Sequence, residues 1–317
     1  MKLIICAPDF CAHSGGTIVL HYLCHLLNRL GCESYLVREP GNFEINAFQV
    51  LRPLLLLTRE YIKNILPIKI NPKFNTPVLS QASALRLAAE DQTVVIYGEM
   101  VFGNPLSAKN IVRYLLHTPG NRSGLFYYGP NELHIWMGDT SVNFSYPFSQ
   151  TCQKPAPINY YPLDIFPPHL WKSRVFKRSQ SALETHKVIY SIRKRSDRTD
   201  IVIKKDWVCI DGLSAKRQAL LFAEAHLFVS YDEYSFLSIF ASLSGCDSVV
   251  LPPPGISIDH WHPNIEDRYG IAYGFDNLDW ARDTKHLLYQ KIMQIEPQSL
   301  NSADYIASQC LEYFCLQ

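Results

Sequence analysis

The segment that most constrains the fold is residues 227–251, LFVSYDEYSFLSIFASLSGCDSVVL. An apolar strand over Leu227–Ser230 is followed by a polar turn over 231–235, a helix with an apolar face that ends at Gly245, and a second strand over Ser248–Leu251. The polar turn therefore opens the helix. A helix N-terminus carries unpaired N–H groups and roughly half a positive charge, so this turn is suited to holding a phosphate.

The beginning of the chain shows the same order of elements. A buried strand over Leu3–Ala7 leads into a Gly-containing loop, and a helical pattern over Thr17–Leu30 stops at Gly31 before a strand over Ser34–Val37. Strand, loop, helix and strand in this order open a Rossmann-like doubly wound sheet.

A Pro-rich stretch over residues 152–170 predicts a linker between two halves. After it the alternation restarts with a strand over 186–192 and an amphipathic helix over 214–225. We therefore predict an α/β protein of two Rossmann-like domains, residues 1–160 and 161–317, facing each other across a cleft, with a terminal helix able to pack back on the first domain.

Shorter patterns predict the remaining elements. These are helices over 83–90 and 108–115, strands over 93–97, 126–128, 133–135, 201–203 and 208–210, and two terminal helices over 287–295 and 302–314.

Composition excludes several classes of protein. Hydrophobic residues make up 47% of the 317 and charged residues 19%, which is typical of a globular protein, and 30 basic against 29 acidic residues give no field that would attract nucleic acid. No apolar run reaches the ~18 residues of a membrane span, and no signal peptide precedes the first strand. Nine Cys without a CxxC pair favour a reduced, cytoplasmic protein with buried thiols.

The first candidate site is Ser14-Gly15-Gly16-Thr17 at the start of the first helix. Two glycines allow a ligand to approach the backbone closely, so Gly15 and Gly16 are predicted to contact a ligand. The sequence is neither GxGxxG nor a Walker loop, and a tight turn without a ligand is the alternative.

The second candidate site lies at the end of the strand over 186–192. Arg193 and Lys194 could clamp a diphosphate there and neutralise it as it leaves, whereas the alternative is a solvated basic turn.

The third candidate site is the turn 231–235 with the first residue of its helix. Asp232 and Glu233 could accept hydrogen bonds from sugar or ribose hydroxyls, while Tyr234, Ser235 and Phe236 would present backbone N–H groups to phosphate. Diphosphate and hydroxyls together indicate a nucleotide-sugar. The alternative is an ordinary capped helix.

Two further polar residues follow strand-like segments. His117 in LLHTPG could hydrogen-bond a sugar or act as a base, and Glu99 in YGEM has the same kind of position. Each could instead be a structural residue whose polar atoms are hydrogen-bonded within the protein. His260 and His262 lack the further ligands of a metal site, and residues 51–66 fit either a buried helix or one at a membrane surface.

These segments together resemble glycosyltransferases of the GT-B fold, and most closely the retaining group 1 family related to glycogen synthase. The motif of that family is approximately E-G-F-G-L followed by E-A-M-A-x-G-x-P-V. Here Asp232 stands at the first acidic position, Tyr234-Ser235-Phe236 replaces the F-G-L turn, and Gly245 is retained. The segment 103–120, GNPLSAKNIVRYLLHTPG, also resembles bacterial polysaccharide glycosyltransferases.

Two positions depart from the motif of that family. Phe240 stands where the family has its second glutamate and cannot bind ribose hydroxyls, and Asp247 replaces the usual proline. Any acidic role in this motif therefore falls to Asp232 or Glu233.

The resemblance implies a metal-independent enzyme, retaining rather than inverting, that moves a sugar from a nucleotide-diphospho-sugar to a glycan or lipid-linked glycan. The implied setting is bacterial lipopolysaccharide or capsule synthesis, in the cytoplasm or at the periphery of the inner membrane. The second domain would bind the donor and the first the acceptor, with no cofactor and no nucleic-acid partner. The alternatives are a catalytically degenerate binding or scaffold protein and a nucleotide-sugar epimerase.

Overall fold

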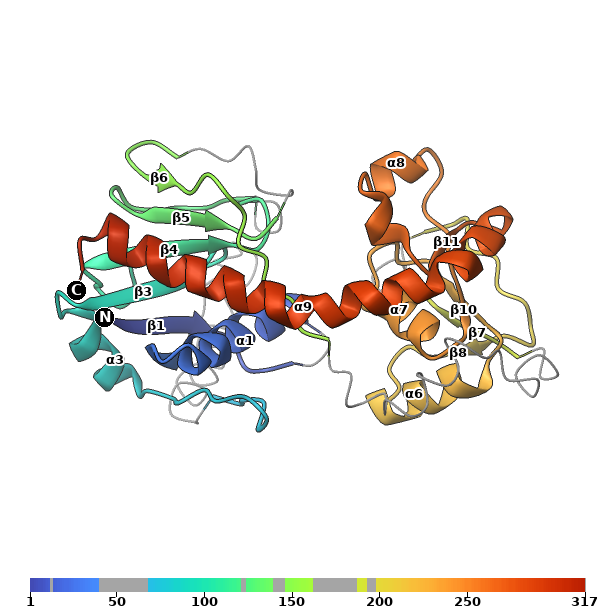
Figure 1. Ribbon diagram of the computed structural model, residues 1–317, viewed down its shortest axis with the longest axis horizontal. Helices are drawn as coiled ribbons and strands as arrows, with labels where there is room; N and C mark the ends of the chain where they lie inside the picture. The colour runs from blue at the N-terminus through green and yellow to red at the C-terminus, as the bar shows by residue number, and fades with distance from the viewer. Residues whose placement is uncertain are drawn as a thin grey trace, which may run out of the picture. The chain divides into compact units, whose positions relative to one another are not determined.

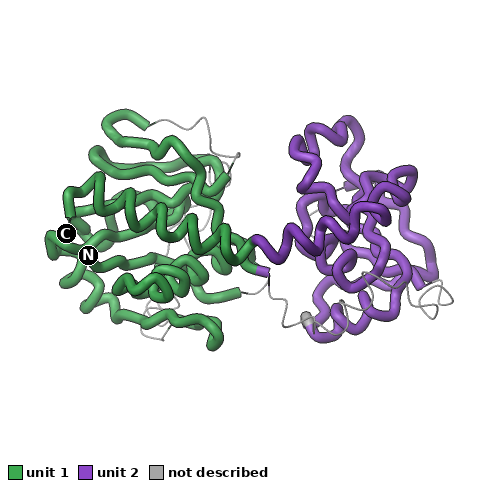
Figure 2. The backbone as a smooth tube through the Cα atoms, viewed as in Figure 1, with its two compact units in different colours: residues 1–160, 295–317 green, residues 161–294 purple. Residues whose placement is uncertain are grey.

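The computed structural model describes residues 1–11, 14–39, 68–120, 124–138, 146–161, 187–192 and 198–316. The chain forms two compact units, one made of residues 1–160 with 295–317 and the other of residues 161–294 (Figure 2).

The first unit contains a sheet in the order β2-β1-β3-β4-β5-β6, and all its neighbouring strands are parallel (Figure 1). Because the chain moves outward to both sides of β1, the sheet is doubly wound, and its direction of winding changes between β1 and β3. The strands are β1 (Lys2–Ala7), β2 (Glu33–Arg38), β3 (Thr93–Gly98), β4 (Asn110–Leu115), β5 (Leu133–Trp136) and β6 (Gln150–Thr151).

Helices cover both faces of this sheet, which explains why its strands are continuous apolar runs. Leu3 and Ile5 share one core cluster with α1 (Gly15–Arg29) and with the last turns of α9 (Leu278–Tyr313). Ile4, on the opposite face of β1, packs in a second cluster with α3 (Gln81–Ala88). The φ of +83° at Gly31 is the left-handed conformation that ends α1.

The second unit repeats this topology with a sheet in the order β11-β10-β9-β7-β8, again parallel throughout. Its winding changes between β7 and β9. The strands are β7 (Val188–Ser191), β8 (Val208–Cys209), β9 (Leu227–Ser230), β10 (Asp247–Val250) and β11 (Ala272–Tyr273). The helical elements of this unit besides α9 are α6 (Ala215–Glu224), α7 (Phe236–Leu243), α8 (Ile258–Trp261), η2 (Ile265–Arg268) and η3 (Phe275–Asn277).

The α/β class with two Rossmann-like sheets is thus confirmed, but several predicted elements are wrong. Residues 110–115 form strand β4 and not a helix, and neither 126–128 nor 201–203 is a strand. The two predicted terminal helices are one continuous helix, α9, which contains Pro297. Residues 295–313 of that helix belong to the first unit.

Within the described part of the chain, no helix combines the length and the hydrophobicity that a membrane-spanning segment requires. All nine cysteines are free thiols, and five of them are buried. Burial raises the pKa of Cys24 to about 12, so this thiol is not a nucleophile at neutral pH.

Candidate functional site

The carboxyl ends of the first sheet bring several polar residues to one edge. Glu39 follows β2, Glu99 follows β3 and His117 comes two residues after β4. Since ligands of doubly wound sheets bind outside the carboxyl ends at the change of winding, the residues after β1 and β3 have the best position for binding. Glu99 is therefore placed as the sequence predicted, at the end of β3.

Two carboxyl groups lie close enough at this edge to influence each other. The Glu99 side chain is 9% exposed, and its Oε2 accepts a hydrogen bond from the backbone N–H of Leu116 at 3.3 Å. Burial, together with the charge of Glu99, raises the pKa of Glu39 to about 7. Glu39 can therefore hold or release a proton near neutral pH, which is the property required of a general acid or base.

We expect this shift to appear in the pH dependence of stability. The folded state keeps the Glu39 proton up to about pH 7, whereas the unfolded chain loses it near 4.5. The contribution of Glu39 protonation to the free energy of unfolding is therefore fully present below about pH 4.5. It is lost as the pH rises to about 7, by up to about 1.4 kcal/mol per pH unit. Glu39→Gln removes it, so urea unfolding of this variant should be less pH-dependent over that window. The control is Glu90→Gln at the surface, and equal pH dependence in both variants would contradict the shift.

The start of α1 lies beside the same edge. A Cβ added at Gly16 would stand 3.6 Å from the Leu116 side chain, which places the first turn of α1 next to the end of β4. Thr17 Oγ1 donates to the Cys11 carbonyl at 3.0 Å and accepts from the Cys11 N–H at 3.1 Å, and these bonds hold the preceding loop. The Ser14 side chain makes no capping hydrogen bond, so it accepts none from the N–H groups of the first turn, which include that of Gly15.

His117 has a geometry that restricts what it can do. Its Nδ1 accepts a hydrogen bond from the backbone N–H of Thr118 at 2.8 Å. A neutral ring in this state carries its proton on Nε2, which then donates a hydrogen bond and does not accept a proton. Of the two roles predicted for His117, this geometry favours hydrogen bonding to a ligand over general base catalysis.

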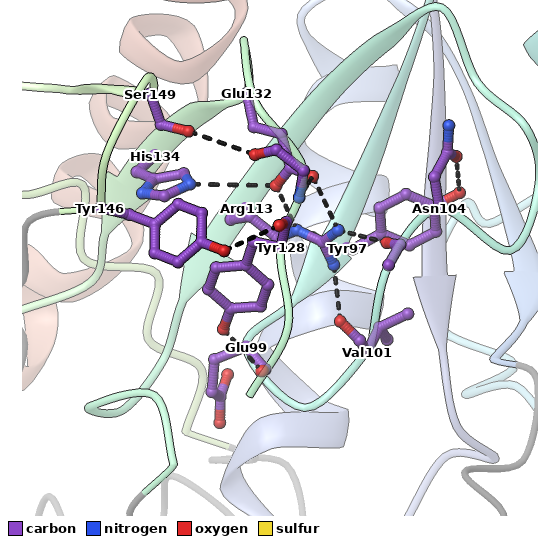
Figure 3. A network of polar contacts seen from close by, with 12 residues as sticks. Tyr97, Glu99, Val101, Asn104, Arg113, Tyr128, Glu132, His134, Tyr146 and Ser149 are labelled. Atoms are coloured by element: carbon purple, nitrogen blue, oxygen red, sulfur yellow. Dashed lines mark hydrogen bonds and ion pairs between the residues drawn. The ribbon is translucent and has the colours of Figure 1, made fainter. Parts of the chain in front are cut away.

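A buried ion pair lies behind Glu99 (Figure 3). The Arg113 guanidinium of β4 donates to both carboxylate oxygens of Glu132, with Nε–Oε2 at 2.6 Å and Nη2–Oε1 at 3.0 Å, and both side chains are almost completely buried. Burial acts to raise the pKa of Glu132, but the nearby His134 ring and the hydrogen bonds from Arg113 outweigh it and lower this pKa below its ordinary value.

In the second unit, the predicted turn 231–235 follows β9 at the change of winding. Asp232 and Glu233 are 4% and 3% exposed. Asp232 Oδ1 accepts from the Tyr234 N–H at 3.3 Å, and the Glu233 carbonyl accepts from the indole N–H of Trp261 at 2.7 Å. Residues 232 and 233 are thus held in an ordered turn with their side chains largely buried.

The same turn opens α7, as the sequence predicted. The Ser235 hydroxyl accepts a hydrogen bond from the Leu237 N–H at 3.2 Å and so caps the helix. Tyr234 is 54% exposed and Phe236 is 44% exposed. The helix start thus carries two partly exposed aromatic side chains.

Arg198 fixes the loops at this edge of the second sheet, a role that the sequence analysis missed. Its guanidinium donates to the carbonyls of Tyr231 at 3.1 Å, Leu251 at 2.6 Å and Pro252 at 3.1 Å. Asp200 accepts from its Nε at 2.8 Å. The loops after β9 and β10 are thereby tied to one cation.

Arg193 and Lys194 lie outside the described residues. The end of β7 that precedes them is well defined, because Asp211 accepts from the Ser191 hydroxyl at 2.5 Å and from the Ile192 N–H at 2.9 Å. β7 runs parallel to β9, so the described end of β7 lies at the same edge of the sheet as the turn 231–235.

The two departures from the family motif have structural roles. Phe240 is 8% exposed and lies in the core of the second unit, where its ring centroid is 6.3 Å from that of Tyr161. Asp247 begins β10 and forms ion pairs with Arg282 at 2.8 Å and Lys285 at 3.3 Å, both on α9. Neither side chain is available to a ligand.

Comparison with known proteins returns remote similarities to solved structures. No protein-family model and no curated protein matches the chain. Among solved structures, MurG from Acinetobacter baumannii has a TM-score of 0.36 at 10% identity, over 98% of this chain and 99% of that one. The glycosyltransferase VinC in complex with DTDP has a TM-score of 0.35 at 12% identity (99% and 95%), and the spinosyn forosaminyltransferase SpnP 0.33 at 12% (98% and 95%). Similarities this low assign neither a family nor a function.

The described residues contain no group of three or more His, Cys, Asp or Glu side chains arranged to hold a metal ion.

Three residues important to the site were not predicted from the sequence. Glu39 follows a strand just as Glu99 does, so the same rule could have found it. Arg113 and Arg198 bind backbone carbonyls distant in sequence, and no local pattern signals this.

Proposed function

We propose that this protein is a glycosyltransferase that takes a sugar from a nucleotide-diphospho-sugar. The proposal rests mainly on the edge of the second sheet where its direction of winding changes. There the turn 231–235 leads into α7 next to the end of β7. The N–H groups of the α7 start suit a diphosphate. Asp232 and Glu233 supply the carboxylates for hydroxyl groups.

In this proposal the second unit binds the donor and the first unit binds the acceptor. Arg193 and Lys194 stabilise the departing diphosphate in place of a divalent cation. Glu99 with Glu39 accepts the proton of the acceptor hydroxyl as its oxygen bonds to the anomeric carbon from the face on which the diphosphate leaves, so that the C–O bond to the diphosphate breaks and the anomeric configuration is kept. His117 donates a hydrogen bond to the sugar.

The finer parts of the proposal come from the sequence resemblance. They are retention of anomeric configuration, a bacterial surface glycan such as lipopolysaccharide or capsule as acceptor, and a cytoplasmic location with peripheral contact at the inner membrane. A non-catalytic nucleotide-binding protein is the second candidate, because Phe240 lies in the core where the resembled motif carries an acid.

A thermal-shift screen with UDP-, GDP-, ADP-, CMP- and dTDP-sugars, without added metal, tests the proposal. A donor at 100 times its Kd should stabilise the protein by about 2.7 kcal/mol. We expect Asp232→Asn and Ser235→Ala to reduce the shift for the selected donor. Ser80→Ala, which removes the matching cap of α3 in the other unit, should not. No shift with any donor in folded protein would contradict the proposal. Binding followed by conversion of the donor without an acceptor would indicate an epimerase.

A further inference from the structure

The buried ion pair behind Glu99 does more than neutralise two charges. Besides Glu132, the Arg113 guanidinium donates to the carbonyl of Val101 at 2.6 Å and to that of Gly103 (Figure 3). These two carbonyls belong to the loop that begins with Glu99. One fully buried side chain thus holds the backbone of this loop at two points.

Aromatic rings hold the same guanidinium from two other segments. The Arg113 carbon Cζ lies 4.9 Å from the ring centroid of Tyr97 and 4.5 Å from that of Tyr128. Tyr97 comes two residues before Glu99, and its hydroxyl donates to Asn104 Oδ1 at 3.0 Å. Residues before and after Glu99 are therefore fixed to a single buried cation.

Tyr128 contacts the Glu99 residue directly. Its hydroxyl donates to the Glu99 backbone carbonyl at 2.7 Å. The Tyr128 carbonyl in turn accepts from the Tyr146 hydroxyl at 2.9 Å, and the Gly103 N–H donates to the Tyr127 carbonyl at 2.8 Å. Residues 127 and 128 are thus hydrogen-bonded to the loop that carries Glu99 at two of its residues, Glu99 and Gly103.

We propose that Arg113 and Tyr128 are positioning residues that fix the Glu99 carboxylate at the change of winding of the first sheet, next to the Leu116 N–H and within range of Glu39. The inference rests on the proposed function in treating Glu99 as the acceptor-side carboxylate. A buried ion pair generally adds little net stability over an apolar replacement. We therefore assign this network the role of fixing the geometry around Glu99.

The test is Tyr128→Phe, with Tyr114→Phe as its matched control. Tyr114 lies next to Arg113 on β4, is also buried, and donates its hydroxyl to a backbone carbonyl, that of Ala156, at 2.6 Å. Both variants lose one buried hydroxyl-to-carbonyl hydrogen bond, so their losses of stability should be similar. Only Tyr128→Phe removes a contact with Glu99.

The first readout is independent of activity. In protein labelled with ¹³C at glutamate carboxyl groups, the Glu39 titration reports how close the Glu99 charge lies. Cys6 is a further titratable group that interacts with Glu39. We expect Tyr128→Phe to shift the Glu39 midpoint by at least half a pH unit and Tyr114→Phe to leave it unchanged. Equal midpoints in wild type and both variants would overturn the proposal.

The second readout is sugar transfer with the donor selected by the screen. Tyr128→Phe should lower kcat at least tenfold with an unchanged donor Kd, and Arg113→Lys, which keeps the charge but loses the fork of donors, should do the same. Equal kcat in the two Tyr variants would contradict positioning. If the wild type transfers no sugar, the proposed function fails, and the titration still decides whether Arg113 and Tyr128 position Glu99.

Discussion

Replacing Glu132 by glutamine is expected to destabilise the first unit by about 3–5 kcal/mol, because it leaves the Arg113 charge buried without its counter-ion. The Arg113 and Glu132 side chains are 0% and 1% exposed and make two hydrogen bonds to each other. The measurement is the free energy of unfolding in urea. Because the pKa of Glu132 lies below its ordinary value, the wild-type advantage should be present above about pH 4.5 and lost as the pH falls further.

The control for this variant is Asp91→Asn, which breaks the ion pair of Lys109 with Asp91. Those side chains are 56% and 82% exposed, so less than about 1 kcal/mol should be lost. A double-mutant cycle with Arg113→Met measures the coupling within the buried pair. A loss for Glu132→Gln no larger than that for Asp91→Asn would contradict the expected cost of leaving the Arg113 charge buried without its counter-ion.

Replacing Glu99 by glutamine is expected to reduce sugar transfer by about 10²–10⁴-fold, the usual contribution of a general base. Glutamine has nearly the same shape, and its side-chain oxygen can still accept from the Leu116 N–H, so the fold should be retained. Donor binding should also be unchanged, because the proposed donor contacts are in the second unit. The measurement is kcat for transfer together with the donor Kd.

The control for Glu99→Gln is Glu90→Gln, an equal exchange at the surface. The same Glu99 variant should lower the pKa of Glu39, since the Glu99 charge contributes to raising it. Transfer within a few fold of wild type would exclude Glu99 as the base. Loss of donor binding would instead indicate that Glu99 acts in the fold or on the donor.

The sequence predicted best those elements whose local pattern agrees with their tertiary setting. β1, α1 and β9 were found because continuous apolar strands and a broad apolar helix face are typical of layers buried between other layers. The helix after the turn 231–235 was found from its apolar face, and the turn was found because polar residues such as Ser235, an ordinary N-cap, precede that face.

The errors arose where a distant partner decides the structure. The helix predicted over 108–115 is strand β4, which buries Arg113 because Glu132, 19 residues later, neutralises it. The predicted break near Pro297 is absent from α9. Close by, the Ser299 hydroxyl accepts from the Asn159 N–H and donates to its carbonyl, each at 3.0 Å, and this contact joins positions 140 residues apart.

The most direct test of the central claim is hydrogen–deuterium exchange with and without the nucleotide-sugar that gives the largest thermal shift. The account predicts slower exchange in peptides covering residues 231–237, whose N–H groups are proposed to hold the diphosphate. Peptides of α3, which also begins with a serine cap, should be unchanged. Protection confined to other parts of the chain, with residues 231–237 unaffected by a bound donor, would contradict the proposed donor site.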